Sequence, residues 1–432
     1  MPPSRRPDGV LCLGNVSLAE IARDARFGTP AYVYDVDAIT AEGRELREAF
    51  DGAPHLVAYA VKANSAGPIV KALAAVGCGA DVVSGAELTL ALRCGISPED
   101  IVFSGVAKTD AELDLAISSG PAGIGSIQVE SNEEIPRIAA RASAAGRVAR
   151  VSLRINPGVD KEALDTHSYI ATGHDEAKFG VPLSSVPDAL ERVARSPSVR
   201  LVGVGSHVGS QLTAVDGYLA SARALFSFAR EVRARFPLTF VDPGGGFGID
   251  YGEGCPVRPA DFVRATRALQ KEMGLGDLAL YCEPGRSMVG AHGVLVANVI
   301  QRKVAEGRRW TMIDAGMNDL MRPALYQARH RIVPVVLDPA APVSAYRVVG
   351  PVCESSDDFG IHDLPDDVAG STLRAVAILD AGAYGYSMAS RYNGRAMAAE
   401  VFLSGGNVAC ATPRSSAEDW VQDRLRAGSG LV

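Results

Sequence analysis

The sequence predicts an α/β fold in which a (β/α)8 barrel of the TIM type is joined to a second, mainly antiparallel β domain. Between residues 56 and 282, eight short apolar runs alternate with longer helical patterns, as parallel strands and crossover helices do. After residue 290, strand-like runs follow one another with Gly and Pro between them and without long helices. A barrel needs about 250 residues, so a chain of 432 has room for both parts.

The elements of the barrel follow in order along the chain. Its candidate strands are 56–61, 79–83, 101–105, 125–129, 150–155, 201–206, 238–242 and 278–282. Helix-like segments between them include 65–76, 85–93, 109–119, 131–145 and 213–235. Eight such units close a barrel, whereas an open doubly wound sheet usually has fewer. We therefore expect the barrel at 36–285 and the β domain at 286–432, with the N-terminal segment 1–35 joining the β domain.

Composition restricts the class of partner. Hydrophobic residues make up 47% of the chain and charged residues 22%, as in a folded protein with a sizeable core. A formal net charge of -7 gives no broad basic surface for nucleic acid, so a small-molecule partner is expected.

The cysteines and the apolar runs predict the compartment. The seven cysteines, Cys255 among them, are odd in number and include no CxxC, so we expect neither a disulfide framework nor a metal cluster. The N-terminal MPPSRRPDG lacks the apolar core of a signal peptide, and no apolar run approaches the roughly 20 residues that span a bilayer. The sequence therefore predicts a cytoplasmic protein without membrane association.

Polar residues recur at the ends of the predicted strands, where barrel enzymes build their sites. In chain order they are Lys62, Asp81, Ser84, Ser104, Glu130, Arg154, Asn156, His207, Gly244, Gly245, Gly246 and Glu283. Any one of them has a plainer explanation: a solvated strand-end Lys, a tight glycine turn, a structural His or a surface carboxylate. The repetition at successive strands is what predicts an active site.

The chemistry of four of these features fits one ligand. Lys62 follows an apolar strand, which would desolvate its amine and make it a nucleophile. Gly244–Gly246 offer backbone N–H groups to a phosphate, His207 offers a flat ring and Glu283 a carboxylate. An amine-reactive, phosphorylated aromatic aldehyde would use all four, which points to pyridoxal 5′-phosphate (PLP).

Longer motifs carry a family resemblance over about residues 28–420. In order they are YAVKANS, GADVVSGAEL, IVFSGVAKT, LRINPGVD, SHVGSQL, DPGGGFGIDY, EPGR, DAGMNDLMRPALY, GPVCESSD and DAGAYGYSMASRYNGR. The sequence resembles the barrel-type PLP-dependent amino-acid decarboxylases, and among them the diaminopimelate decarboxylases.

The resemblance implies a role for each matching residue. Lys62 would bond to the cofactor's aldehyde, His207 would lie against its ring and Glu283 would pair with the pyridine nitrogen. Asp81, Ser210, Gly244, Gly245, Gly246, Arg286 and Tyr384 complete the implied cofactor site.

The resemblance also implies a substrate site and a partner chain. Arg322 and Tyr326 would bind the substrate's distal carboxylate, with Arg286, Arg154 and Tyr384 also lining the site. Cys353 as proton donor and Glu354 as substrate contact would come from the second subunit of a homodimer with shared active sites. Read without the family, Cys353 is a small core residue, and Arg322 with Tyr326 is a surface pair.

The expected reaction is the decarboxylation of meso-diaminopimelate to L-lysine and CO2. The alternative is a decarboxylase of the same fold acting on an ornithine- or arginine-like amino acid, or on one tethered to a carrier. A racemase fits less well, because Glu283 keeps the cofactor ring a strong electron sink, and a non-enzymatic PLP-binding protein leaves Cys353 and Glu354 unexplained. Two departures from the family pattern, Arg391 and the extra residues before Thr166, bear on the substrate.

Overall fold

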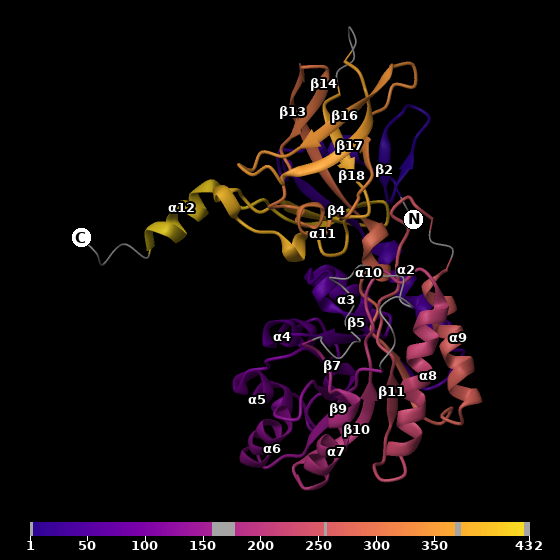
Figure 1. Cartoon of the computed structure of the whole chain (residues 1–432). Coiled ribbons are helices and arrows are strands. Elements are labelled where there is room, and N and C mark those ends of the chain that lie inside the picture. The colour runs from indigo at the N-terminus through magenta and orange to yellow at the C-terminus, as the bar shows by residue number, and fades with distance from the viewer. Residues whose placement is uncertain (1–2, 158–177, 255–256, 368–372, 427–432) are drawn as a thin grey trace. The chain divides into compact units, whose positions relative to one another are not determined.

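The computed structural model describes residues 3–157, 178–254, 257–367 and 373–426. It divides into two compact units (Figure 1). The barrel domain comprises Thr40–Ile249 and Cys255–Met288, and the β domain comprises Met1–Ile39, Asp250–Gly254 and Val289–Val432. Cys255 and Thr166 lie outside the described residues. In the described part of the chain, no helix is long and apolar enough to cross a membrane.

The barrel domain is a closed ring of parallel strands, which confirms the predicted (β/α)8 fold. Around the ring, each strand pairs in parallel with its neighbours in the order β10-β11-β12-β5-β6-β7-β8-β9. In the described residues the strands are β5 (His55–Ala60), β6 (Gly79–Val82), β7 (Ile101–Phe103), β8 (Ser126–Val129), β9 (Ala149–Arg154), β10 (Val199–Gly205), β11 (Phe240–Asp242) and β12 (Ala279–Cys282).

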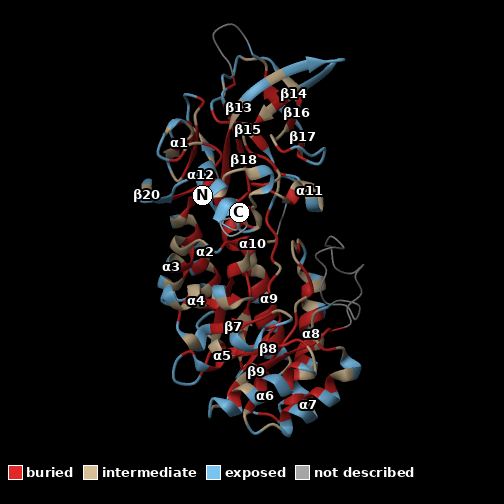
Figure 2. Ribbon diagram, turned by 90° about the vertical axis from the view of Figure 1, so that its left-hand side faces the viewer, coloured by how far each residue is buried: buried red, intermediate tan, exposed pale blue. Residues whose placement is uncertain are grey.

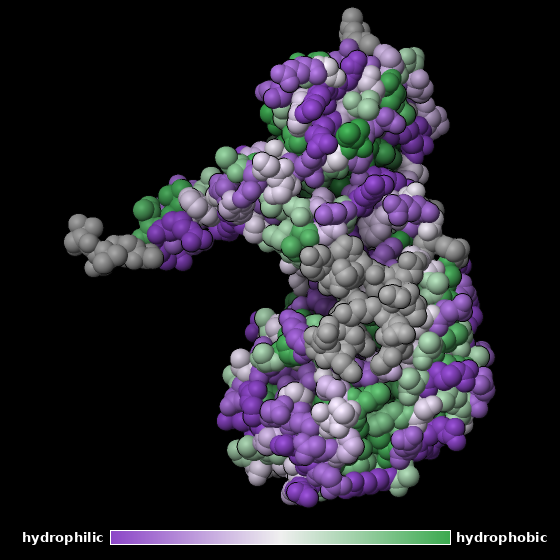
Figure 3. Space-filling model, in the orientation of Figure 1, coloured by the Kyte–Doolittle hydropathy of each residue, from purple (hydrophilic) through white to green (hydrophobic). Residues whose placement is uncertain are grey.

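Helices surround the ring, with their buried faces toward the strands and their exposed faces outward (Figure 2). They are α2 (Val36–Glu48), α3 (Gly67–Ala75), α4 (Gly85–Arg93), α5 (Asp110–Ser118), α6 (Glu134–Ala144), α7 (Val186–Ala194), α8 (Val215–Val232) and α9 (Pro259–Glu272). A short helix after β12, α10 (Arg286–Val289), is buried along its whole length. Local signals fix where several begin. Ser84 caps α4, Thr109 and Glu112 form a capping box on α5, and proline starts α9. On the face of the barrel domain seen in Figure 3, hydrophilic and hydrophobic residues are mixed.

The β domain contains a nine-stranded sheet and a small three-stranded sheet among the described residues. The main path of the large sheet runs β17-β16-β14-β13-β4-β19-β20, and β18 pairs with β13 and β15. Except for β14 with β16 and β4 with β19, the described neighbours in it are antiparallel, which confirms a mainly antiparallel second domain. The elements are β1 (Ser4–Arg5), β2 (Leu11–Leu13), β3 (Val16–Ser17), α1 (Leu18–Arg23), β4 (Ala31–Asp35), β13 (Gly293–Ala305), β14 (Arg308–Ile313), α11 (Arg322–Tyr326), β15 (Ile332–Pro334), β16 (Val343–Val349), β17 (Asp358–Pro365), β18 (Ala375–Ile378), β19 (Ala399–Ser404), β20 (Asn407–Thr412) and α12 (Ala417–Arg426).

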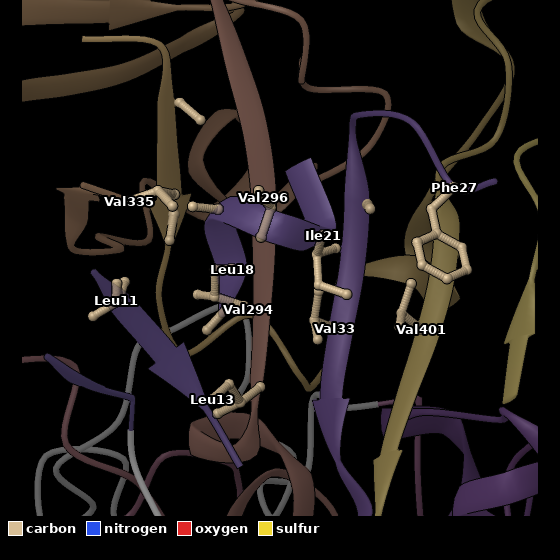
Figure 4. Close-up of a cluster of buried hydrophobic side chains, with 14 of the residues drawn as sticks. Leu11, Leu13, Leu18, Ile21, Phe27, Val33, Val294, Val296, Val335 and Val401 are labelled. Atoms are coloured by element: carbon tan, nitrogen blue, oxygen red, sulfur yellow. The ribbon is translucent and has the colours of Figure 1, made fainter. Parts of the chain in front are cut away.

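The core of the β domain joins the two ends of the chain. Strand β4 from the N-terminal segment pairs with β13 on one side and with β19 on the other. Side chains from β2, α1, β4, β13 and β19 pack together in this core (Figure 4). Its labelled members are Leu11, Leu13, Leu18, Ile21, Phe27, Val33, Val294, Val296, Val335 and Val401. Removing this apolar surface from water is what holds the distant segments together.

Candidate active site

Lys62 lies directly after β5, in a short 3-10 turn, Val61–Ala63. Its Nζ forms an ion pair with Asp81, whose side chain is fully buried at the end of the neighbouring strand β6. Burial raises the pKa of Asp81, and the positive charge of Lys62 opposes that rise. The amine of Lys62 therefore has a carboxylate beside it that can take its proton, which a nucleophilic amine requires.

Glu283 follows β12 and is also buried, with 4% of its side chain exposed. Its Oε2 lies 3.6 Å from Nδ1 of His207, and its Oε1 accepts a 3.5 Å hydrogen bond from Ser104. Burial opposes ionisation, but the hydrogen bond and charge of His207, with the charges of Lys62 and Arg154, outweigh it and lower the pKa of Glu283. Glu283 is therefore a buried carboxylate at neutral pH.

A second buried acid, Asp242, lies at the end of β11 and behaves in the opposite way. Burial and then the negative charge of Glu283 raise its pKa well above the ordinary value, which favours the protonated form of this carboxyl. Its Oδ1 accepts a 2.9 Å hydrogen bond from the backbone N–H of Gly244. Because the surroundings lower the pKa of Glu283 and raise that of Asp242, they favour a negative charge on Glu283 over one on Asp242.

The three glycines after β11 have a geometric reason to be glycine. Gly244 and Gly246 have φ values of +80° and +90°, in the left-handed region. Gly245 bridges to Glu283, and a Cβ on Gly245 would collide with the carbonyl oxygen of Glu283. This loop therefore brings bare backbone up to the strand that carries the buried carboxylate, as a phosphate cradle does.

Arg286 begins α10 and is buried in the same domain. One of its Nη atoms donates a 3.0 Å hydrogen bond to the hydroxyl of Ser210, in the loop after β10. The structure therefore brings together two of the residues predicted to lie near a phosphate.

Arg154 is the last residue of β9, and it is buried in contact with other residues of the protein. Its Nη1 donates a 3.0 Å hydrogen bond to Glu130, and its guanidinium lies 4.9 Å from the ring centre of Phe179. Glu130 also accepts 2.8 Å hydrogen bonds from the N–H groups of Gly105 and Gly180. Contact of Arg154 with substrate stays a prediction, and its observed partners make it a brace between the strand-end loops.

The β domain holds the residues predicted to select the substrate. Arg322 and Tyr326 both lie on α11, where Arg322 is buried and Tyr326 partly buried. Tyr384 is partly buried in a loop with a φ of 56°.

Two neighbours of Arg322 were missed by the sequence reasoning. His330 Nε2 lies 2.7 Å from its Nη1, and the ring of Tyr251 lies 5.0 Å from its guanidinium. The spacing of His330 from Arg322 gives no signal, because α11 ends at Tyr326 before His330 is reached. Tyr251 ends the quoted run DPGGGFGIDY, but nothing in that run points to Arg322.

Cys353 and Glu354 are exposed, in the loop between β16 and β17. The backbone N–H of Cys353 donates a 2.7 Å hydrogen bond to Asn393, and Tyr392 donates one of 2.9 Å to Glu354. Arg391, one of the departures from the family pattern, pairs with Asp423 of α12 at 3.1 Å. The two residues that follow Arg391 in sequence, Tyr392 and Asn393, thus support the loop of Cys353.

Comparisons with known proteins identify the family of this chain. Residues 36–290 match the family model described as pyridoxal-dependent decarboxylase, pyridoxal binding domain. Diaminopimelate decarboxylase of Zymomonas mobilis is 40% identical over 431 residues, which cover 99% of each chain. That of Aquifex aeolicus is 37% identical over 420 residues, covering 97% of this chain and 96% of the relative.

Solved structures give the same family. Diaminopimelate decarboxylase from M. jannaschii with L-lysine superposes with a TM-score of 0.89 at 33% identity, covering 98% of this chain and 97% of that one. Diaminopimelate decarboxylase from Helicobacter pylori with L-lysine superposes with a TM-score of 0.84 at 38% identity, covering 92% of this chain and 97% of that one. The chain belongs to the pyridoxal-dependent decarboxylases and, among them, to the diaminopimelate decarboxylase family.

Proposed function

We propose that the protein decarboxylates meso-diaminopimelate to L-lysine and CO2 with PLP as its cofactor. The observation that carries this proposal is the 40% identity to a diaminopimelate decarboxylase over 99% of both chains. The alternatives are an ornithine-like, arginine-like or carrier-tethered amino acid as substrate. Arg322 argues against a distal amine, because a guanidinium binds a carboxylate and repels an ammonium group.

The residues of the barrel domain fit PLP. Lys62 would hold the cofactor through its amine, and Asp81 would accept that amine's proton. The glycine loop, Ser210 and Arg286 would hold the phosphate, since the loop leaves no room for a side chain at Gly245. When bound, PLP supplies an electron sink for the bond that breaks as CO2 leaves.

Glu283 would keep a proton on the pyridine nitrogen, with His207 against the ring. The low pKa of this buried carboxylate supports the role, because a carboxylate that stays ionised stabilises a positive charge next to it. The raised pKa of Asp242 disfavours a second negative charge beside Glu283.

The substrate has two amino-acid ends, and one of them must be spared. Arg322 and Tyr326, together with Arg286, would bind the carboxylate of the end that remains, and Arg154 and Tyr384 would line the site. A bidentate guanidinium fixes both the position and the direction of a carboxylate, so the other end is presented for reaction.

Cys353 would deliver the proton that replaces CO2, and Glu354 would bind the substrate's ammonium group. Both are exposed in the single chain, which supports their use in the active site of a second subunit. We therefore propose a homodimer with shared active sites. A cytoplasmic location is proposed from the cysteine pattern alone.

The test of the proposed function is CO2 release from meso-diaminopimelate, ornithine, arginine, lysine and glutamate with PLP present. Release from meso-diaminopimelate far above the other four is the expected result. A preference for ornithine or arginine would select the alternative, and no release from any of them would leave a PLP-binding protein or a carrier-tethered substrate.

A further inference from the structure

We propose that His330 and Tyr251 are positioning residues that hold the guanidinium of Arg322 in the one orientation that binds the spared amino-acid end of the substrate. This inference rests on the proposed function, because it assigns Arg322 to that carboxylate. Arg322, His330 and Tyr251 all belong to the β domain, although Tyr251 follows the last residue of a barrel-domain segment.

The tautomer of His330 follows from its two neighbours. Nδ1 lies 2.9 Å from the carbonyl oxygen of Leu379, and that oxygen can only accept a hydrogen bond. Nδ1 therefore carries the proton, which leaves Nε2 of the neutral ring as an acceptor. Arg322 supplies the donor to Nε2 at 2.7 Å. His330 thus connects the guanidinium to the backbone of the sheet.

The backbone partner of His330 is itself fixed. The N–H of Leu379 donates a 2.9 Å hydrogen bond to the carbonyl oxygen of Arg331, so both sides of Leu379 are bonded to the 330–331 segment. Arg331 also donates a 2.8 Å hydrogen bond to Asp380. His330 is buried between these contacts, so its ring has little freedom to follow a moving side chain.

Tyr251 contacts both the ring of His330 and the guanidinium of Arg322. Its ring meets the His330 ring edge to face at 5.3 Å and lies 5.0 Å from the guanidinium carbon of Arg322. The turn that carries Tyr251 is fixed by Asp250, whose Oδ1 accepts hydrogen bonds from the N–H groups of Gly252 and Gly254 at 2.6 and 2.9 Å.

Holding a long side chain in its binding orientation increases affinity, because less rotamer freedom is lost when the ligand binds. The contribution of His330 should therefore appear in the binding of a ligand that has the carboxylate and not in one that lacks it. L-lysine keeps that carboxylate, and cadaverine is the same diamine without it. Their dissociation constants separate the carboxylate contact from everything else in the site.

The experiment measures both dissociation constants by calorimetry on the PLP-loaded enzyme, with two amide variants of His330. His330→Asn places its amide where Nδ1 was, so it keeps a partner for Leu379 and no longer reaches Arg322. His330→Gln extends to the position of Nε2 and keeps an acceptor for Arg322. His362→Asn is the matched control, because His362 also bonds a backbone carbonyl, that of Phe359 at 2.8 Å, on β17.

We expect His330→Asn to raise the dissociation constant of L-lysine roughly tenfold, which is the effect of one hydrogen bond to a charged group. The dissociation constant of cadaverine should change less than about twofold. His330→Gln should restore most of the L-lysine affinity, and His362→Asn should leave both ligands unchanged. In turnover of meso-diaminopimelate, His330→Asn should raise KM and leave kcat within about twofold. If His330→Asn does not fold, Tyr251→Leu takes its place and should show the same split between the two ligands.

Two failures can be told apart with Arg322→Ala. If Arg322→Ala weakens the binding of L-lysine but His330→Asn and Tyr251→Leu do not, the positioning role is wrong and the proposed function stands. An unchanged L-lysine affinity in Arg322→Ala itself would overturn the assignment of that arginine to the carboxylate. Equal losses for L-lysine and cadaverine in His330→Asn would show a general structural role, which also overturns the inference.

Discussion

Oε2 of Glu283 lies 3.6 Å from Nδ1 of His207, and the side chain of Glu283 is 4% exposed. Neighbouring positive charges keep this carboxylate ionised in spite of its burial, while its negative charge helps to keep Asp242 protonated. The barrel domain thus contains two buried acids whose pKa values are shifted in opposite directions, which is how one site assigns different tasks to chemically similar groups.

This difference predicts opposite results for two matched substitutions. Glu283→Gln removes the negative charge and should lower kcat roughly 10²-fold or more, with folding retained. Asp242→Asn resembles the protonated acid that the raised pKa of Asp242 favours, and it keeps an oxygen for the N–H of Gly244, so it should retain most of the activity. Steady-state kinetics of both variants at saturating PLP is the measurement. Similar losses in the two would mean that the charge on Glu283 is not what matters.

Lys62 should be the residue that PLP modifies. Borohydride treatment of the PLP-loaded protein, followed by peptide mapping, should find the phosphopyridoxyl group on Lys62, because its amine has the proton acceptor Asp81 beside it. Lys108 is a natural control, because its Nζ also pairs with a carboxylate, Glu134 at 3.0 Å, but its side chain is only 1% exposed, whereas that of Lys62 is 35% exposed and can be reached by PLP. Label on Lys108, or unchanged labelling in Lys62→Ala, would show that Lys62 is not the residue that PLP modifies.

Cys353 should act in the partner's active site. Cys353→Ala should slow turnover about 10²- to 10⁴-fold, the usual contribution of a positioned general acid, without changing PLP content. Mixing Cys353→Ala with Lys62→Ala protomers should restore activity, because a shared site then has one intact copy in each mixed dimer. If mass measurement confirms that mixed dimers form and they stay inactive, both residues act within one chain.

Glu400 should make the stability of the β domain depend on pH. Burial raises its pKa from 4.5 to about 7, against the opposing hydrogen bond from Tyr34. A folded-state pKa above the unfolded one means that the stability is fully present below about pH 4.5 and is lost as pH rises to about 7. The loss is at most roughly 3 kcal/mol.

Thermal unfolding at several pH values measures this effect. Glu400→Gln should flatten the decline in Tm between about pH 5 and 7 and should raise Tm most above pH 7. The exposed Glu306→Gln serves as the control. A decline that is equally steep in Glu400→Gln would assign the pH dependence to other groups, among them Asp319, whose pKa burial also raises to about 7.

The sequence by itself determined the barrel and the cluster at its strand ends. Lys62, Asp81 and Glu283 were found because parallel strands in a closed barrel all end at the same mouth, so residues far apart in the chain are brought together by topology alone. The glycine loop was found for a related reason, since a run of three glycines after a strand removes every side chain from one point of that mouth.

The tertiary structure decided what depends on contacts between distant segments. Arg154 reads from the sequence as one more strand-end cation, but its guanidinium is bonded to Glu130 and packed on Phe179. The opposite pKa shifts of Asp242 and Glu283 depend on burial and on which charges lie near each acid after folding. Tyr251 meets Arg322 across 71 positions of sequence (322 − 251), and no local pattern encodes such an approach, because side-chain packing between separate segments decides it.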